Sequence, residues 1–200
     1  MIKILVNEIF ESIQGEGKYA GYPMLFIRLS GCTRKCDFCD TKYHTEGKKV
    51  AIRDVVARIH ESKVGIVCWT GGEPGQQVEE MSEVIFRTKG KKHHLETNGD
   101  LVIDWSDFEY VCFSPKDEVA CKNIKKNYNG NNMDIKVVTD LKLNRELIPY
   151  ATLLMSLTVV EPNPDANNFI RQKVWDYCSK HNIRYSPRLH VEIWGTKRGI

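Results

Sequence analysis

Three cysteines lie close together in one segment of the chain and could hold a metal cluster. Cys32, Cys36 and Cys39 have the spacing Cys-x3-Cys-x2-Cys. Three thiolates can bind three irons of a [4Fe–4S] cluster and leave the fourth iron without a protein ligand, whereas an electron-transfer ferredoxin normally uses four thiolates. The spacing therefore points to chemistry at an open iron rather than to passive electron transfer.

The main alternative for these cysteines is a zinc site. Zinc usually takes four ligands, often from two Cys-x2-Cys pairs, and a second pair is absent from this sequence. The remaining cysteines are scattered singly, which argues against a second cluster. Two of them stand in apolar runs and are interpreted as small buried hydrophobic residues. The roles of all four stay open: Cys68, Cys112, Cys121 and Cys178.

Polar or glycine-rich groups follow several of the apolar runs. Thr70-Gly71-Gly72-Glu73-Pro74 comes directly after the run 65–69, and residues 96–99 and 114–116 end the next two runs. Glycine lets a backbone approach a ligand closely. Each group taken alone is a weak signal, because each is also a common turn sequence.

The chain alternates strand-like and helix-like segments, which predicts a largely parallel sheet. The ends of such strands meet on one side, where α/β folds bind ligands. About six βα units predict an α/β fold in the form of an open, partial TIM-like barrel, with residues 1–200 as one domain. The expected strands are 3–10, 24–30, 65–69, 94–96, 110–113, 134–138 and 152–157; the expected helices are 52–61, 78–86 and 169–179; Ile183 and 189–194 are expected to be extended.

The bulk composition excludes several classes of protein. A net charge of +3 over 200 residues is too small to indicate nucleic-acid binding by itself. No apolar run approaches the roughly 20 residues of a membrane span, and the start of the chain carries no signal-peptide core. Clustered cysteines under these conditions favour metal binding over disulfides. We therefore expect a cytoplasmic protein with no membrane or nucleic-acid partner.

The cysteine spacing, followed by Gly-Gly-Glu-Pro after the next strand, resembles the radical S-adenosylmethionine (SAM) superfamily. In that superfamily the open iron binds the amino and carboxylate groups of SAM, and an electron from the cluster yields a 5′-deoxyadenosyl radical. The resemblance implies that Cys32, Cys36 and Cys39 bind the [4Fe–4S] cluster. It implies a further set of SAM contacts: Phe38, Asp40, Gly71, Gly72, Glu73, Asn98, Ser114 and Lys116.

The segment Ser-Ile-Gln-Gly-Glu-Gly (12–17), Cys-Asp-Thr (39–41) and the end Leu-His-Val-Glu-Ile-Trp-Gly (189–195) resemble the 7-carboxy-7-deazaguanine synthase family. That family converts 6-carboxy-5,6,7,8-tetrahydropterin to 7-carboxy-7-deazaguanine with release of ammonia, in queuosine and 7-deazapurine biosynthesis. The resemblance implies Mg²⁺, bound by Thr41, and assigns no separate catalytic side chain. It implies these substrate contacts: Gln14, Glu16, Arg28, Thr70, Thr97, His190 and Ile200.

The resemblance also implies a flavodoxin-like electron donor and a homodimer. The chain departs from the family pattern at Thr33-Arg34, where Asn-Leu is commoner, and at Phe38, where Trp is commoner. The nearest rival is an activase that places a glycyl radical on a partner protein; a non-catalytic iron–sulfur or nucleic-acid-binding module is a further alternative. The Gln-Gly-Glu-Gly segment and Arg28 argue against the activase, because binding a protein substrate does not require polar groups that hydrogen-bond to a pterin ring.

Overall fold

The elements of the computed structural model fall into two units joined along the chain. It describes residues 2–37, 39, 41, 43–158, 164–195 and 197–199. The first unit comprises Met1–Ser12, Pro23–Val111 and Arg198–Ile200, and the second comprises Ile13–Tyr22 and Cys112–Lys197. Strand β6 (Tyr110–Phe113) carries the chain from the first unit into the second. Each unit is described by itself below.

The first unit is built on a sheet with the strand order β3-β1-β2-β4-β5. The strands β2, β4 and β5 are parallel, and β3 runs antiparallel to β1. This direction places the C-terminal ends of β2, β4 and β5 at one edge of the sheet. The loop that carries Cys32, Cys36 and Cys39, here called the cysteine loop, follows β2, and the polar segments 70–74 and 96–99 lie at the ends of β4 and β5. The bounds are β1 (Lys3–Ile13), β2 (Pro23–Leu29), β3 (Lys48–Ala51), β4 (Ile66–Gly71) and β5 (Lys92–Thr97).

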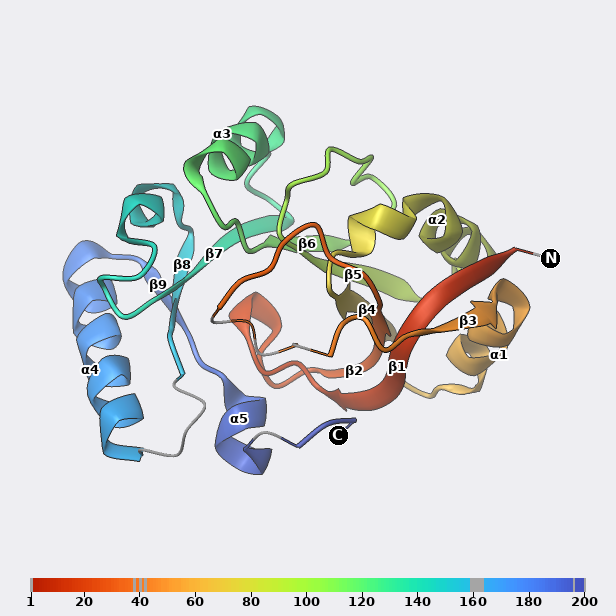
Figure 1. Ribbon diagram of the computed structural model, residues 1–200, viewed down its shortest axis with the longest axis horizontal. Coiled ribbons are helices and arrows are strands. Elements are labelled where there is room, and N and C mark those ends of the chain that lie inside the picture. Colours follow the sequence, from red (N-terminus) through yellow and green to blue (C-terminus); the bar gives the residue numbers. More distant parts are fainter. Residues whose placement is uncertain are drawn as a thin grey trace. The chain divides into compact units, whose positions relative to one another are not determined.

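Two amphipathic helices pack in the first unit, α1 (Ile52–Glu61) and α2 (Val78–Arg87), and they lie together in Figure 1. The short 3₁₀ helix η2 (Pro74–Gln77) leads into α2. Helix α1 buries Ile52, Val55 and Ile59, a stripe with helical spacing. The core between helices and sheet includes the fully buried side chains of Trp69 and Leu95.

The second unit contains the parallel strands β7 (Met133–Thr139), β8 (Leu153–Ser156) and β9 (Arg184–Ser186), in that order. The long helix α4 (Pro164–His181) lies beside β8 and β9, as Figure 1 shows at the blue end of the colour scale. The other helical elements are η1 (Gly17–Tyr19), α3 (Glu118–Asn127), η3 (Arg145–Tyr150) and α5 (Leu189–Trp194).

Most of the expected elements are confirmed, but the end of the chain is not. The predicted helix 52–61 and the predicted strand 110–113 have the same bounds as α1 and β6. The expectation that 189–194 is extended is wrong, because these residues form α5. The alternation of apolar residues over six positions suggested a strand, and a segment this short does not distinguish the two periods. The amide of Val191 instead donates to the carbonyl of Arg188, and Gly195, with φ +65°, ends the helix.

Several elements were not expected from the sequence, among them α3, the edge strand β3 and the 3₁₀ helices. The expected class, α/β with largely parallel strands, agrees with the sheets of both units. Among the described residues, the helices are all too short or too polar to cross a membrane.

Candidate functional site

The three cysteines of the loop after β2 differ from the other four in exposure. Cys32, Cys36 and Cys39 are partly exposed and are not in disulfides, whereas the remaining cysteines are buried. Three accessible thiols in one loop match the chemistry of a cluster ligand set. Within the part of the chain that the structure describes, no three His, Cys, Asp or Glu side chains lie close enough together to hold a metal ion. The assignment of these cysteines as ligands therefore stays a prediction that rests on their spacing and exposure.

The Gly-Gly-Glu-Pro turn lies directly against the start of the cysteine loop. The amide of Gly72 donates to the carbonyl of Leu29 at 3.2 Å, and the amide of Glu73 donates to the carbonyl of Gly31 at 2.8 Å. A Cβ atom on Gly72 would lie 1.8 Å from the Gly31 oxygen, and one on Gly71 would lie 2.1 Å from the Leu29 oxygen. The two glycines are therefore required for contact between two backbone segments, whatever ligand the turn also binds.

Glu73 connects this turn to the end of β5. Its side chain is completely buried. One carboxylate oxygen accepts hydrogen bonds from the amide of Gly75 at 2.8 Å and the hydroxyl of Thr97 at 2.7 Å, and the other accepts from the amide of Asn98 at 2.7 Å. Burial raises the pKa of Glu73 above its ordinary value, and the three donors oppose this rise. Three residues predicted for the site, Glu73, Thr97 and Asn98, are thus brought together by one carboxylate.

Arg28 and Thr41 are also brought together in the first unit. The Nη1 of Arg28 donates to the Thr41 hydroxyl at 3.2 Å, and its Nε donates to Glu8 at 3.2 Å. Thr70 stands opposite Arg28 in the parallel register of β2 and β4. Glu8 also pairs with a second cation, because the Nε of Arg198 donates to its other carboxylate oxygen at 2.9 Å. Arg28 therefore has a fixed orientation, with a carboxylate on one side and a hydroxyl on another.

In the second unit, Glu16 lies among cations. Its carboxylate is 2.6 Å from the Nζ of Lys136, 3.2 Å from the Nε of Arg188 and 3.9 Å from the Nε2 of His190. Lys136 is only 5% exposed although it is a lysine. Burial by itself would raise the pKa of Glu16, but the charges of Lys136, Arg188 and His190 outweigh burial and lower the pKa far below its ordinary value. Glu16 is therefore ionised at neutral pH and can only accept hydrogen bonds.

This lowered pKa predicts how stability depends on pH. The folded pKa of Glu16 lies below its ordinary value of 4.5, so its contribution is fully present above pH 4.5 and is lost as pH falls towards the folded pKa. We expect Glu16→Gln to be less stable than the unmodified protein at neutral pH, and the difference to shrink below pH 4.5. Urea unfolding at a series of pH values measures this difference. Glu118→Gln, which alters an exposed ion pair with Lys122, is the control; a pH-independent difference for Glu16→Gln would contradict the assignment.

The other residues predicted in the second unit lie near the same loop or near β6. The side-chain oxygen of Gln14 accepts from the amide of Glu16 at 3.2 Å. A Cβ on Gly15 would lie 1.9 Å from the Nδ1 of His190, so the glycine is needed where the loop meets α5. After β6, the Nζ of Lys116 donates to the hydroxyl of Ser114 at 3.0 Å. Phe38, Asp40 and Ile200 were also predicted for the site and lie outside the described residues.

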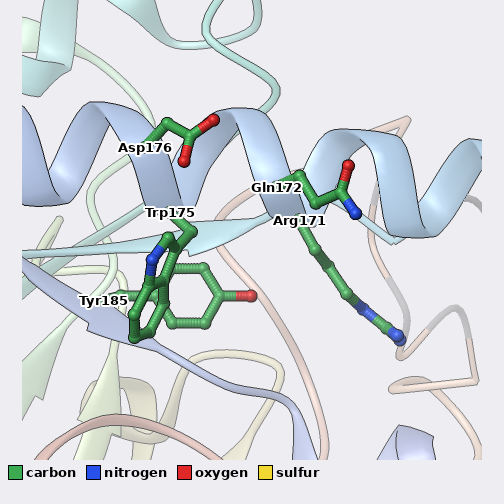
Figure 2. Close-up of a pocket in the computed structure, with 5 residues that line it drawn as sticks. All are labelled: Arg171, Gln172, Trp175, Asp176 and Tyr185. Atoms are coloured by element: carbon green, nitrogen blue, oxygen red, sulfur yellow. The ribbon is translucent and has the colours of Figure 1, made fainter.

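The hollow drawn in Figure 2 is a separate feature of the second unit. It has a volume of about 360 Å³ and lies between α4 and β9, and it is lined by Arg171, Gln172, Trp175, Asp176 and Tyr185. The rings of Trp175 and Tyr185 meet edge to face with their centroids 5.4 Å apart. None of the described residues predicted for the site lines this hollow.

Four charged residues that lie near the predicted site residues were not predicted from the sequence. Lys136 could have been found, because it is a single lysine inside the apolar strand 133–139. Glu8, Asp100 and Arg188 gave no comparable signal, since each stands in an ordinary polar context. Their partners are distant in sequence and became visible only in the fold: Arg28 for Glu8, Arg34 for Asp100 and Glu16 for Arg188.

Comparison with known proteins places this geometry in a family. The Radical SAM superfamily matches residues 26–109. A 7-carboxy-7-deazaguanine synthase from Thermoplasma acidophilum is 31% identical over 98% of this chain and 100% of its own length. The chain belongs to this family. The family's synthase from Hyperthermus butylicus is 37% identical and covers 94% of the chain and 92% of its own length.

One solved structure also has a similar fold. QueE from Escherichia coli has a TM-score of 0.71 at 22% identity, and the match covers 93% of this chain and 94% of QueE. At this identity the likeness shows the fold alone, and it agrees with the expected open, partial barrel. Membership of the radical SAM superfamily implies a [4Fe–4S] cluster and SAM as cofactors. The partly exposed thiols of the cysteine loop are suitable ligands for such a cluster.

Proposed function

We propose that this chain is a radical SAM lyase that converts 6-carboxy-5,6,7,8-tetrahydropterin to 7-carboxy-7-deazaguanine with release of ammonia. The observation that carries the proposal is the end-to-end match to 7-carboxy-7-deazaguanine synthases, which spans both units. The arrangement inside the first unit supports it, because the Gly-Gly-Glu-Pro turn is bonded both to the cysteine loop and to the end of β5.

We assign the cluster and SAM to the loop and turn of the first unit and to the segment after β6. Cys32, Cys36 and Cys39 would hold the cluster, which when bound supplies the electron that cleaves SAM. The backbone of Gly71 and Gly72 would bind SAM, together with Phe38, Asp40, Asn98, Ser114 and Lys116. Glu73 belongs to this set through the shape it gives the turn, since both of its oxygens already accept hydrogen bonds from the protein.

Arg28 and Thr41 are assigned to the carboxylate end of the substrate and to Mg²⁺. A guanidinium can bind a carboxylate bidentately. Glu8 and Thr41 hold the guanidinium of Arg28 in one orientation. Mg²⁺ prefers oxygen ligands and keeps several waters, so a single hydroxyl from Thr41 is a suitable protein contribution. Thr70, opposite Arg28 in the register, and Thr97 at the end of β5 complete the substrate contacts proposed for the first unit.

Glu16 is assigned to recognition of the pterin ring. An ionised carboxylate accepts hydrogen bonds and donates none, which suits the N–H groups of the ring edge. Lys136 and Arg188 support this role because they keep the carboxylate charged and in place. Gln14, His190 and Ile200 are the further substrate contacts that we propose from the family resemblance.

The remaining proposals concern the setting of the enzyme. A cluster that delivers electrons needs an external donor, for which we propose a flavodoxin-like protein. We propose that the chain acts as a homodimer, that residues 1–200 form one radical SAM domain, and that it works in the cytoplasm. Seven cysteines in the described ranges with no disulfide among them are compatible with a reducing compartment.

A reaction under anaerobic conditions tests the function. Reconstituted protein with SAM, Mg²⁺, a reductant and the carboxytetrahydropterin is expected to release 7-carboxy-7-deazaguanine, followed by its absorbance and its mass. Cys36→Ala should lose both cluster and product, whereas Cys178→Ala, at a buried cysteine of the second unit, should keep both. Release of 5′-deoxyadenosine without the deazaguanine would instead favour an activase that acts on a protein.

A further inference from the structure

Two side chains of the cysteine loop reach across to the residues that follow β5. The guanidinium of Arg34 binds Asp100 with two contacts, Nε to Oδ2 at 2.7 Å and Nη2 to Oδ1 at 2.6 Å. The hydroxyl of Thr33 donates to the same Oδ2 at 2.7 Å. Asp100 therefore binds two neighbouring residues that stand between the first and second cysteines of the loop.

The far side of this contact is fixed to the Glu73 turn. The Nδ2 of Asn98 donates to the Thr33 hydroxyl at 2.9 Å, and its Oδ1 accepts from the amide of Asp100 at 2.9 Å. The amide of Asn98 is held in turn by the buried carboxylate of Glu73. A continuous series of hydrogen bonds thus runs from the cysteine loop to the fully buried carboxylate of Glu73.

The geometry of the Arg34–Asp100 pair makes it stronger than an ordinary surface ion pair. Bidentate guanidinium–carboxylate pairs fix orientation as well as distance. The Asp100 side chain is 13% exposed and that of Arg34 is 31% exposed, so water screens the pair only in part. Of the loop that it restrains, the described residues between the end of β2 at Leu29 and the start of β3 at Lys48 lie in neither strand nor helix. Ordering such a loop costs conformational entropy, and a side-chain contact that restrains it lowers the remaining cost of binding a cluster.

We propose that Thr33, Arg34 and Asp100 form a tether that holds the cysteine loop against the end of β5, and that Arg34 is a positioning residue for the cluster ligands. This inference rests on the proposed role of Cys32, Cys36 and Cys39 as ligands. It concerns the two residues that directly follow Cys32. A leucine at position 34 could make neither bond to Asp100, so the tether depends on the guanidinium of Arg34.

The first test uses the protein before a cluster is added. Lys35 is exposed and is a trypsin site next to the tethered residues. Asp100→Asn keeps the size of the side chain and removes its charge, and we expect cleavage after Lys35 to become about tenfold faster, as loss of a charge-assisted pair predicts. The control is Asp54→Asn, which alters an ion pair with Arg53 on α1 at the surface. Cleavage at the unmodified rate in Asp100→Asn would overturn the tether.

The second test follows the cluster itself. We expect reconstituted Arg34→Leu and Asp100→Asn to release iron to a chelator about tenfold faster than the unmodified protein. The double variant, Arg34→Leu with Asp100→Asn, should release iron no faster than either single variant, because the two residues act through each other. Additive effects, or release at the unmodified rate, would refute the pair. Circular dichroism and thermal unfolding establish that each variant is folded, and Thr33→Val, which removes only the hydroxyl bonds, provides a milder variant.

The outcome for the ligands is separable from the outcome for the tether. If Cys36→Ala keeps its cluster, the ligand assignment fails, and the proposed role of the tether in positioning cluster ligands fails with it. If Cys36→Ala loses its cluster while Arg34→Leu and Asp100→Asn retain iron normally, the ligand assignment stands and only the tether is wrong. The electron paramagnetic resonance spectrum of the reduced cluster, with and without SAM, gives a readout independent of turnover: we expect a smaller response to SAM in both tether variants.

Discussion

Gly72→Ala is expected to destabilise the protein by about 3 kcal/mol or more, because overpacking against backbone leaves little room for relaxation. The new Cβ would lie 1.8 Å from the Gly31 oxygen and 3.0 Å from the Cβ of Cys32. A flexible side chain could move away, but the Gly31 carbonyl is held by the amide of Glu73 at 2.8 Å. The turn must therefore separate from the cysteine loop, and both the unfolding midpoint in urea and the iron content after reconstitution should fall.

Gly65→Ala is the matched control for this substitution. A Cβ on Gly65 meets nothing within 4 Å, and its φ is not in the left-handed region. We expect the free energy of unfolding of Gly65→Ala to lie within about 0.5 kcal/mol of the unmodified protein. Equal stability of Gly72→Ala and Gly65→Ala would show that the turn and the loop do not have the contact described here.

Lys136→Met is expected to cost about 3 kcal/mol, the scale seen when one partner of a buried ion pair is removed. The Nζ of Lys136 is 2.6 Å from Glu16, and the side chain is 6% exposed. Methionine fills a similar volume but leaves the carboxylate without its shortest contact. Urea unfolding, followed by the fluorescence of tryptophans such as Trp175 on α4, measures the lost free energy of unfolding.

The surface of the same unit provides a control for Lys136→Met. Lys122 pairs with Glu118 on α3 at 3.3 Å, with exposures of 59% and 47%. Lys122→Met should change stability by less than about 0.5 kcal/mol, because exposed pairs contribute little. The double variant Glu16→Gln with Lys136→Met should lose less than the sum of the single variants. Strict additivity would mean that the two residues do not interact.

The sequence predicted those parts of the fold and site that depend on local pattern. The three cysteines proposed as cluster ligands lie within eight residues of one another, so their spacing alone carries the prediction. Helix α1 follows from the stripe Ile52, Val55 and Ile59. Helix α3 was missed although Asp117, whose side chain accepts from the amide of Ala120, marks its start. The many lysines and asparagines of this helix obscure its buried stripe of Ala120, Cys121 and Ile124.

The parts that the sequence could not predict depend on pairs that are distant along the chain. Glu16 and Lys136 are 120 residues apart, and Arg34 and Asp100 are 66 apart. A single sequence shows which residues are charged but not which opposite charge each one meets, because that is decided by the packing of strands and helices. The resemblance to a family predicted Glu16 as a substrate contact, and only the structure shows the cations that keep it ionised.

The Glu16 cluster also acts as a cross-link. One carboxylate joins the loop before β2 to the middle of β7 and to the start of α5, and two of these connections span 120 and 172 residues. Small proteins often make such long-range connections with disulfides, but none of the seven cysteines, all of which lie in the described ranges, is in a disulfide. Electrostatic cross-links of this kind are insensitive to reductants and respond to acid instead. A protein that keeps its thiols available for iron can thereby tie distant segments together without using cysteine for the purpose.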